Sequence, residues 1–217
     1  MATTPARPAA LSAATAIELL RGYVRLREQL IHQLGNEVTD SLQWEVTPAL
    51  LASDYLYTSA YSTLGSLTDD HIAECLEEFT AVSKSIIETL GRNYIQSTPS
   101  PTKYCSFIDD TAGALGRGAA VIGATLADVD EPHRDHFATL GRGFGTIYRI
   151  QHLLASDGAS IKTDSSLTDR RLRQHAKQRL QETDRALQQL SSTLDVTSLR
   201  TFVTGAISES TVDNILD

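Results

Sequence analysis

The sequence is poor in the residues on which disulfide scaffolds, metal clusters and nucleic-acid binding depend. Its 217 residues include two cysteines, one methionine, one tryptophan and only four lysines. Cys75 and Cys105 lie far apart, in no metal-binding or redox spacing, so we expect two buried free thiols. Acidic residues outnumber basic ones and give a formal net charge of -8, which argues against nucleic-acid binding through bulk positive charge.

Long hydrophobic runs are also missing. The best apolar stretch, residues 118–127, is far shorter than the roughly 20 residues that a membrane-spanning helix needs. The first fifteen residues are mostly alanine, proline, serine and threonine, without the leucine-rich core of a secretory signal. The sequence therefore predicts a cytoplasmic protein with disordered tails over residues 1–11 and 210–217 around one domain, residues 12–209.

The segment from Tyr104 to Ser156 carries the strongest structural signal. Apolar residues recur at spacings of three and four on both sides of a polar turn at residues 128–132, which predicts two long helices. Both are rich in glycine, and each interior glycine destabilises a helix by roughly 1 kcal/mol relative to alanine. Because the apolar period continues through the glycines, we expect close helix packing there and not loops. The glycines are Gly113, Gly116, Gly118, Gly123, Gly141, Gly143 and Gly145.

The rest of the chain shows helical periodicity as well. Helices are predicted over residues 12–34, 49–64 with Thr47-Pro48 as the start signal, 68–90 and 168–194, and after a cap at Asp195 or Thr197. No strand pattern or repeat competes, and 41% hydrophobic residues suffice for a core. The fold class predicted is an all-α, single-domain bundle of about seven helices.

Three polar clusters are candidates for metal binding. Glu28 and His32 are four residues apart, which supplies only two ligands, and Asp109-Asp110 lacks a third acid and is interpreted as a solvated helix edge. Acids and histidines also crowd the polar turn, where the helix dipole favours acids in any case. These are Asp128, Asp130, His133, Asp135 and His136. We therefore predict no metal site.

In this order, the helices resemble the trans-isoprenyl diphosphate synthases, also called polyprenyl synthetases. The resemblance runs from about residue 16 to residue 209. The matching stretches are AIELL at 16–20, LLASDYL at 50–56, IGATLA at 122–127, LGRGFG at 140–145, and the C-terminal positions Ala176, Leu187, Leu190, Phe202 and Val203. The resemblance implies a helical bundle of the isoprenoid synthase type, N-terminally shortened because the family's first helices would precede Ser12.

The chain departs from that family where the family does its chemistry. Family members hold magnesium on a substrate diphosphate with two DDxxD motifs, which supply carboxylates at i, i+1 and i+4. The first motif should follow Leu26, where this chain has Glu28, Gln29 and His32. The second should follow Ile150, where it has His152 and Ser156. Neither place contains an aspartate, so no catalytic residue and no cofactor is expected.

The leading hypothesis is a catalytically degenerate, prenyl-synthase-like protein, a non-catalytic or regulatory subunit in isoprenoid biosynthesis. The alternatives are an active prenyltransferase with a rebuilt site, which would need Mg²⁺, and a protein that binds an isoprenoid or other apolar ligand in the old cavity.

Assembly is predicted from the helix at 49–64, which is apolar on nearly all sides and so belongs in a core or an interface. The resemblance implies that this helix and the next form a dimer interface. We therefore expect a homodimer, or a heterodimer with an active prenyl diphosphate synthase, through Leu50, Tyr57, Tyr61 and Phe79.

Overall fold

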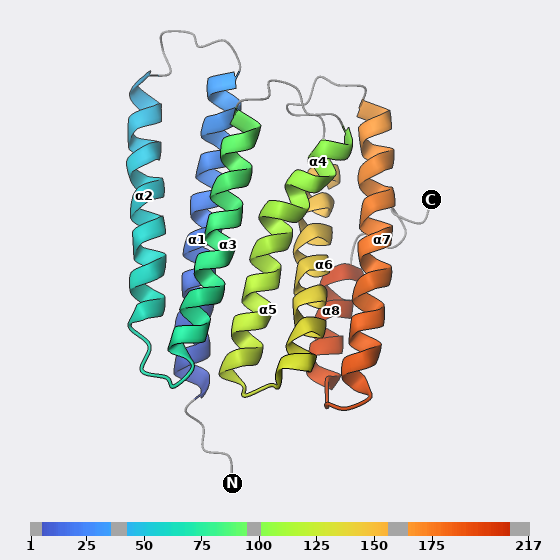
Figure 1. The fold of residues 1–217 in the computed structure, drawn as a ribbon. Coiled ribbons are helices and arrows are strands. Elements are labelled where there is room, and N and C mark those ends of the chain that lie inside the picture. The colour runs from blue at the N-terminus through green and yellow to red at the C-terminus, as the bar shows by residue number, and fades with distance from the viewer. Residues whose placement is uncertain (1–5, 36–42, 95–100, 156–164, 209–217) are drawn as a thin grey trace. The chain divides into compact units, whose positions relative to one another are not determined.

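The computed structural model describes residues 6–35, 43–94, 101–155 and 165–208, and all regular structure in these ranges is helical (Figure 1). The helices are α1 (Ala6–Gly35), α2 (Gln43–Gly65), α3 (Ile72–Tyr94), α4 (Pro101–Ile108), α5 (Ala114–Leu126), α6 (Glu131–Ala155), α7 (Ser165–Ser191) and α8 (Thr197–Ser208), with a π-helical turn, η2 (Asp109–Gly113), between α4 and α5. Because α4, η2 and α5 follow one another without a break, the described ranges hold seven helical segments. The all-α prediction is confirmed.

The chain divides into two compact units, a division that the sequence did not predict. The first contains α1, α2, α3 and the segment Val121–Val129, which ends α5 and begins the following turn. The second contains α4, η2, the first half of α5, and α6 to α8. No helix in the described ranges is long and apolar enough to cross a membrane.

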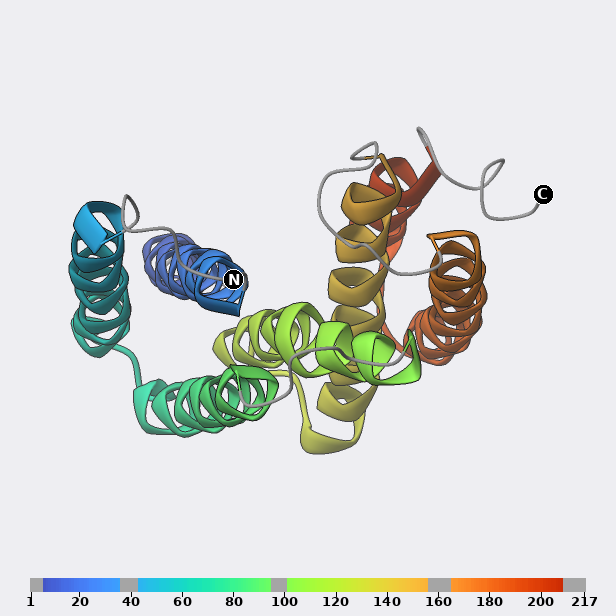
Figure 2. The same ribbon diagram turned by 90° about the horizontal axis from the view of Figure 1, so that it is seen from above.

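In the first unit, α1 packs against α2 and α3, and Figure 2 shows α1 and α2 side by side. Leu20, Leu64, Phe79 and Ile86 are fully buried. An aromatic ladder ties the three helices together. Its ring centroids are 5.2 Å apart from Tyr23 to Tyr57, 5.1 Å from Tyr57 to Tyr61, and 4.9 Å from Tyr61 to Phe79. Packing of this kind adds to the stabilisation from burial alone.

In the second unit, α6 is the central helix and packs against α7, α8, α4 and η2. Its glycines allow the close approach that the sequence predicts. A Cβ on Gly116 would lie 2.1 Å from the Gly141 carbonyl oxygen, and a Cβ on Gly145 would lie 2.2 Å from that of Ala112. A Cβ on Gly143 would lie 2.0 Å from the Thr183 hydroxyl on α7. The prediction of close packing is confirmed at these positions, although Gly123 meets nothing within 4 Å.

Two helix starts differ from the prediction. Helix α1 begins at Ala6, so residues 6–11 are helical and do not belong to a tail. Ala9 is buried there, which gives this first part of the helix a packing surface. Helix α2 begins at Gln43 and contains Pro48, so Thr47-Pro48 is not its start. Pro48 lies only about one turn inside the helix, where a missing N–H removes a single intrahelical hydrogen bond.

Other local predictions are confirmed. Helix α4 begins at Pro101, and the fixed φ of proline suits the first helical position. Asp195 accepts hydrogen bonds from the Thr197 backbone N–H (3.1 Å) and hydroxyl (2.7 Å) at the start of α8. Cys75 and Cys105 are both buried free thiols.

Candidate functional site

The two positions at which the resemblance places the metal motifs lie in different units. Glu28 and Gln29 are in the last turns of α1, half-buried and exposed respectively, and His32 is in the same helix but its side chain lies outside the described residues. His152 is exposed on α6. Its ring packs on Tyr148 at 4.6 Å between centroids, with 3.0 Å from Nε2 to the Tyr148 hydroxyl. Ser156 lies outside the described residues.

The crowded turn between α5 and α6 does not form a metal centre. Two of its acids pair with histidines instead: His71 Nε2 lies 2.6 Å from Asp128 Oδ1, and His133 Nδ1 bonds to Asp130 Oδ1. Across the part of the chain that the structure describes, no three histidines, cysteines or acids group in a way that could hold a metal ion.

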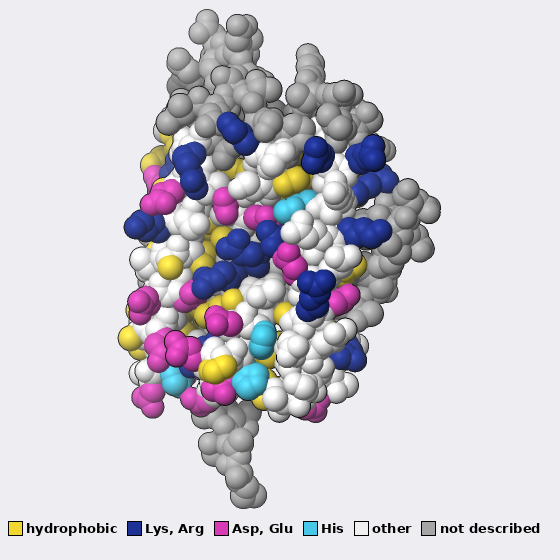
Figure 3. All heavy atoms as spheres, turned by 45° about the vertical axis from the view of Figure 1, so that its right-hand side comes forward, with side chains coloured by type: hydrophobic (Ala, Val, Ile, Leu, Met, Phe, Trp, Pro, Cys, Tyr) yellow, Lys and Arg dark blue, Asp and Glu magenta, His cyan; other side chains and the backbone are white. Residues whose placement is uncertain are grey.

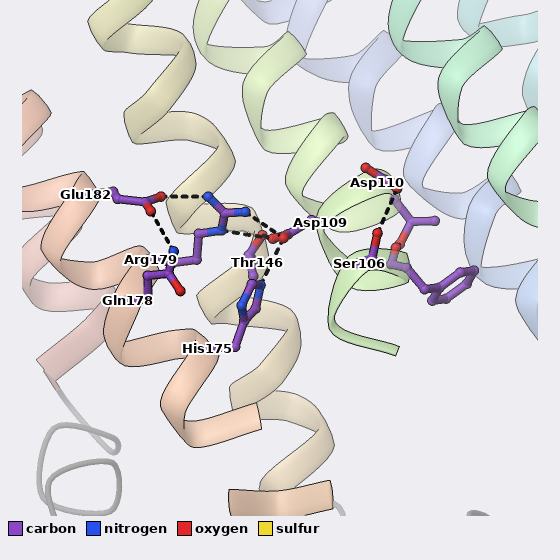
Figure 4. A network of polar contacts seen from close by, with 10 residues as sticks. Ser106, Asp109, Asp110, Thr146, His175, Gln178, Arg179 and Glu182 are labelled. Atoms are coloured by element: carbon purple, nitrogen blue, oxygen red, sulfur yellow. Dashed lines mark hydrogen bonds and ion pairs between the residues drawn. The ribbon is translucent and has the colours of Figure 1, made fainter. Parts of the chain in front are cut away.

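A cluster of charged and polar side chains surrounds Asp109, the first residue of η2 (Figure 4). Arg179 on α7 donates twice to it, Nε to Oδ1 at 3.1 Å and a terminal nitrogen to Oδ2 at 2.6 Å. His175 Nε2 donates to Oδ2 at 2.9 Å, and the Thr146 hydroxyl on α6 donates to Oδ1 at 2.9 Å. Four hydrogen bonds thus join one carboxylate to two other helices.

The same cluster extends along α7. The second terminal nitrogen of Arg179 donates to Glu182 at 2.6 Å, and the Gln178 amide donates to the other oxygen of Glu182 at 3.1 Å. Burial of Asp109 disfavours its charge, but the hydrogen bonds from His175 and Arg179 outweigh burial and lower the pKa of this carboxyl to about 2. Asp109 is therefore ionised at neutral pH, and its lone pairs are occupied.

The interpretation of Asp109-Asp110 as a solvated helix edge is wrong for Asp109, whose side chain is 9% exposed. Successive residues of a helix point in different directions, so only one of two adjacent acids can face α7. Asp110 points away from the cluster, and the Ser106 hydroxyl donates to it at 3.3 Å (Figure 4).

Sequence reasoning missed this cluster because its members are 37 to 70 positions apart. One local signal was available. His175 and Arg179 lie four residues apart, on the same side of α7 as the buried Leu172 and Ala176, where two basic groups need an acidic partner. The sequence alone does not identify that partner.

Three of the four predicted interface residues pack inside the first unit. Phe79 is fully buried, and Tyr57 and Tyr61 are half-buried in the aromatic ladder. Burial, together with the hydrogen bond to Tyr61, raises the pKa of Tyr57 to about 12. The apolar side chains that α2 exposes are Leu51 and Tyr55, at 65% and 71% exposure. A dimer remains a prediction, and these two residues are the better candidates for its surface.

Comparison with known proteins gives one relationship in sequence and several in fold. No protein-family model matches the chain. It is 25% identical over 149 residues to the short chain isoprenyl diphosphate synthase of Methanocaldococcus jannaschii. That match covers 65% of this chain but only 45% of the relative, so the chain spans less than half the length of the curated protein it matches.

Two solved structures show the same architecture. A geranyltranstransferase from Methanosarcina mazei superposes with a TM-score of 0.69 at 16% identity, covering 95% of this chain and 77% of that one. The geranylgeranyl pyrophosphate synthetase of Geoglobus acetivorans gives 0.60 at 17% identity, covering 97% and 85%. These structures define the class of the fold, which is that of the all-α isoprenoid synthases.

The sequence relationship agrees with this fold, because both are similarities to trans-isoprenyl diphosphate synthases. The resemblance found in the sequence is thereby confirmed.

Proposed function

We propose that this chain is a non-catalytic member of the trans-isoprenyl diphosphate synthase family and that it acts as a regulatory subunit in isoprenoid biosynthesis. The observation that carries the proposal is the composition of the two motif positions. Glu28, Gln29 and His32 stand at the first, and His152 and Ser156 at the second. Magnesium prefers oxygen ligands in octahedral geometry, so single glutamate, amide and imidazole groups do not replace a carboxylate trio.

The buried acid in the second unit supports the same conclusion. Asp109 is a buried, ionised carboxylate, and a carboxylate of this kind could in principle serve as a metal ligand. Its oxygens are already committed to Arg179, His175 and Thr146. A carboxylate surrounded by four donors, two of them from a guanidinium, is a structural group and not an open metal ligand.

The alternative is an active prenyltransferase with a rebuilt site, and the sequence relationship to a synthase favours it. A regulatory subunit would instead alter the rate or product length of an active synthase to which it binds. The exposed Leu51 and Tyr55 on α2 offer an apolar contact for such a partner or for a second copy.

The deciding experiment measures condensation of radiolabelled isopentenyl diphosphate with allylic diphosphates in the presence of Mg²⁺. The protein alone should give no product above a boiled control. Mixing it with a full-length synthase from the same source should change the rate or product length of that enzyme. Turnover by the pure protein, abolished by a chelator and reduced by Glu28→Ala or His152→Ala, would instead establish the enzyme.

A further inference from the structure

Helix α7 carries a row of basic side chains on its solvent-exposed surface. Arg170, Arg173 and Lys177 are all exposed and recur at spacings of three and four, which places them on one side of the helix. The buried Leu172 and Ala176 lie on a different side, against the rest of the second unit. Figure 3 brings the α7 side of Figure 1 forward, and basic side chains gather at its upper right. We call the three exposed residues the basic ridge.

The basic ridge has no acidic counterpart among the described residues. None of its three side chains forms a hydrogen bond or an ion pair with another described residue, and this includes Asp169, the acid adjacent to Arg170. Like charges at spacings of three and four repel one another and destabilise a helix. An anionic group bound to the ridge would offset this repulsion.

The surroundings of the ridge decide which kind of anion fits. The exposed α7 positions beside it include Gln174 and Gln181, and the ridge itself offers no aromatic or aliphatic anchor of the kind on which protein interfaces are centred. The formal net charge of -8 opposes the binding of a long polyanion such as a nucleic acid. A short acidic peptide that is covalently linked to the same unit meets neither objection.

Such a peptide follows α8 directly in the sequence. Residues 209–217 lie outside the described residues, and their sequence is ESTVDNILD. Glu209, Asp213 and Asp217 recur at every fourth position, and the segment contains no lysine, arginine or histidine. Three acids at spacings of four thus stand against three bases at spacings of three and four.

The path of α8 leads back towards the ridge. Phe202 packs on Phe144 with 5.5 Å between ring centroids, so it lies close to the neighbouring Gly143. Gly143 in turn meets Thr183 on α7. The buried Val203 packs in the same cluster as residues from the last turns of α7. Helix α8 therefore runs alongside α7 in the reverse direction (Figure 1).

The end of α8 consequently reaches the level of the ridge. Ser208 is six residues past Phe202, about 9 Å along the helix axis. Lys177 is six residues before Thr183, about 9 Å in the same direction. From Lys177 to Arg170 the ridge extends about 10 Å further. Nine residues of chain span up to about 30 Å, which is enough to pass around α7 and follow the ridge.

We propose that the acidic segment 209–217 binds the basic ridge of α7, with Glu209 nearest to Lys177 and Asp217 nearest to Arg170. Each exposed ion pair is weak by itself, but the link through α8 keeps the acids at a high local concentration beside the ridge. The segment covers the ridge against other anions, whether or not the chain is catalytic. The contact weakens in salt, because the screening length falls from about 10 Å at 0.1 M to about 3 Å at 1 M.

Carbodiimide coupling tests the contact, because it joins a lysine amine to a carboxylate where the two touch. Lys177 is the one lysine of the ridge. We expect mass spectrometry to find Lys177 joined to Glu209 or Asp213 at about 50 mM salt, with a yield that falls at least roughly five-fold at 1 M salt. In a mixture of isotope-labelled and unlabelled protein, both halves of each linked peptide should carry the same label.

Charge reversal on α7 separates the ridge from chance contact. Arg170→Glu combined with Arg173→Glu should lower the yield of the Lys177 links at least roughly five-fold at low salt, because the ridge then repels the acids. Arg185→Glu is the matched control, since Arg185 is also exposed on α7 and has no partner in the described part of the chain. It should leave the yield within about two-fold of the wild type.

A charge exchange gives the second check, and it serves if the double reversal does not fold. Arg173→Glu alone should lower the yield of the link between Lys177 and Glu209, and the further change Asp213→Lys should restore it. The proposal is overturned if Lys177 does not couple to residues 209–217 at low salt, or if it couples to the acids of residues 156–164 instead. It is equally overturned by linked peptides that mix the two labels, or by yields that the ridge substitutions leave unchanged.

Discussion

Arg179 on α7 donates a hydrogen bond to each oxygen of Asp109, with 3.1 Å from Nε to Oδ1 and 2.6 Å from a terminal nitrogen to Oδ2. This bidentate geometry orients α7 and also neutralises the charge of the carboxylate. Gly143 allows the helices to come this close, since a Cβ there would collide with Thr183, one turn beyond Arg179. The ion pair thus positions α7 against η2, and Gly143 allows α7 to approach α6.

The first prediction concerns the stability of this pair. Asp109→Asn removes the charge but leaves the buried guanidinium of Arg179, and an unpaired buried charge destabilises a protein by about 3–5 kcal/mol. We expect a loss near the lower end of that range, because Glu182 still contacts Arg179. Urea denaturation followed by circular dichroism measures it. Asp110→Asn is the matched control, and a loss as large in Asp110→Asn would contradict the structural role of Asp109.

The second prediction is the pH dependence that follows from Asp109. Its pKa of about 2 lies below the ordinary 3.8, so its contribution to stability is present above pH 4. It is lost as the pH falls through 4 towards 2, because the unfolded state binds the proton first. The difference corresponds to about 2 kcal/mol. Denaturation midpoints between pH 2 and 5 should therefore fall more steeply in the wild type than in Asp109→Asn. Equal slopes in the two proteins would exclude Asp109 as the group responsible.

The third prediction uses the glycines of α5 and α6. Gly141→Ala would place a Cβ 2.2 Å from the Gly116 carbonyl oxygen, a backbone atom that cannot move aside, so the helices must separate. We expect a loss of at least 2 kcal/mol in the free energy of unfolding. Gly123→Ala is the matched control, since it meets nothing within 4 Å. That change should stabilise the protein by up to about 1 kcal/mol through helix propensity. The idea of close packing fails if both substitutions have the same sign.

These glycines also show what a sequence of this kind reveals. The apolar period through Gly116 and Gly141 predicts helices in close contact, because a period of three to four residues is a local property. The element order and fold class follow from the same signal. The helix starts at Ala6 and Gln43 do not follow from it, and in α1 the buried Ala9 shows packing ahead of the predicted start.

The candidate site divides in the same way. The residues at the two expected motif positions can be read from the sequence, since the motifs are local patterns. The partners of Asp109 are not, because its contacts with Arg179 and His175 depend on how α7 docks. Likewise, Tyr57 and Leu51 both belong to the apolar helix in the sequence, and only the structure shows that Tyr57 packs against Tyr23 while Leu51 is exposed.

The last prediction tests assembly, and it rests on this difference between α2 residues. If α2 forms a subunit contact, Leu51→Glu should weaken the assembly without unfolding the protein, because a charge is added to a side chain that is 65% exposed. Tyr57→Glu should instead unfold the first unit, since it introduces a charge between the rings of Tyr23 and Tyr61. Light scattering over a range of protein concentrations, paired with circular dichroism, distinguishes the two outcomes. A wild-type protein that is monomeric at tens of micromolar and retains no synthase in a pull-down would remove the basis for a regulatory subunit. An assembly that survives Leu51→Glu and Tyr55→Glu together would place the contact on another surface.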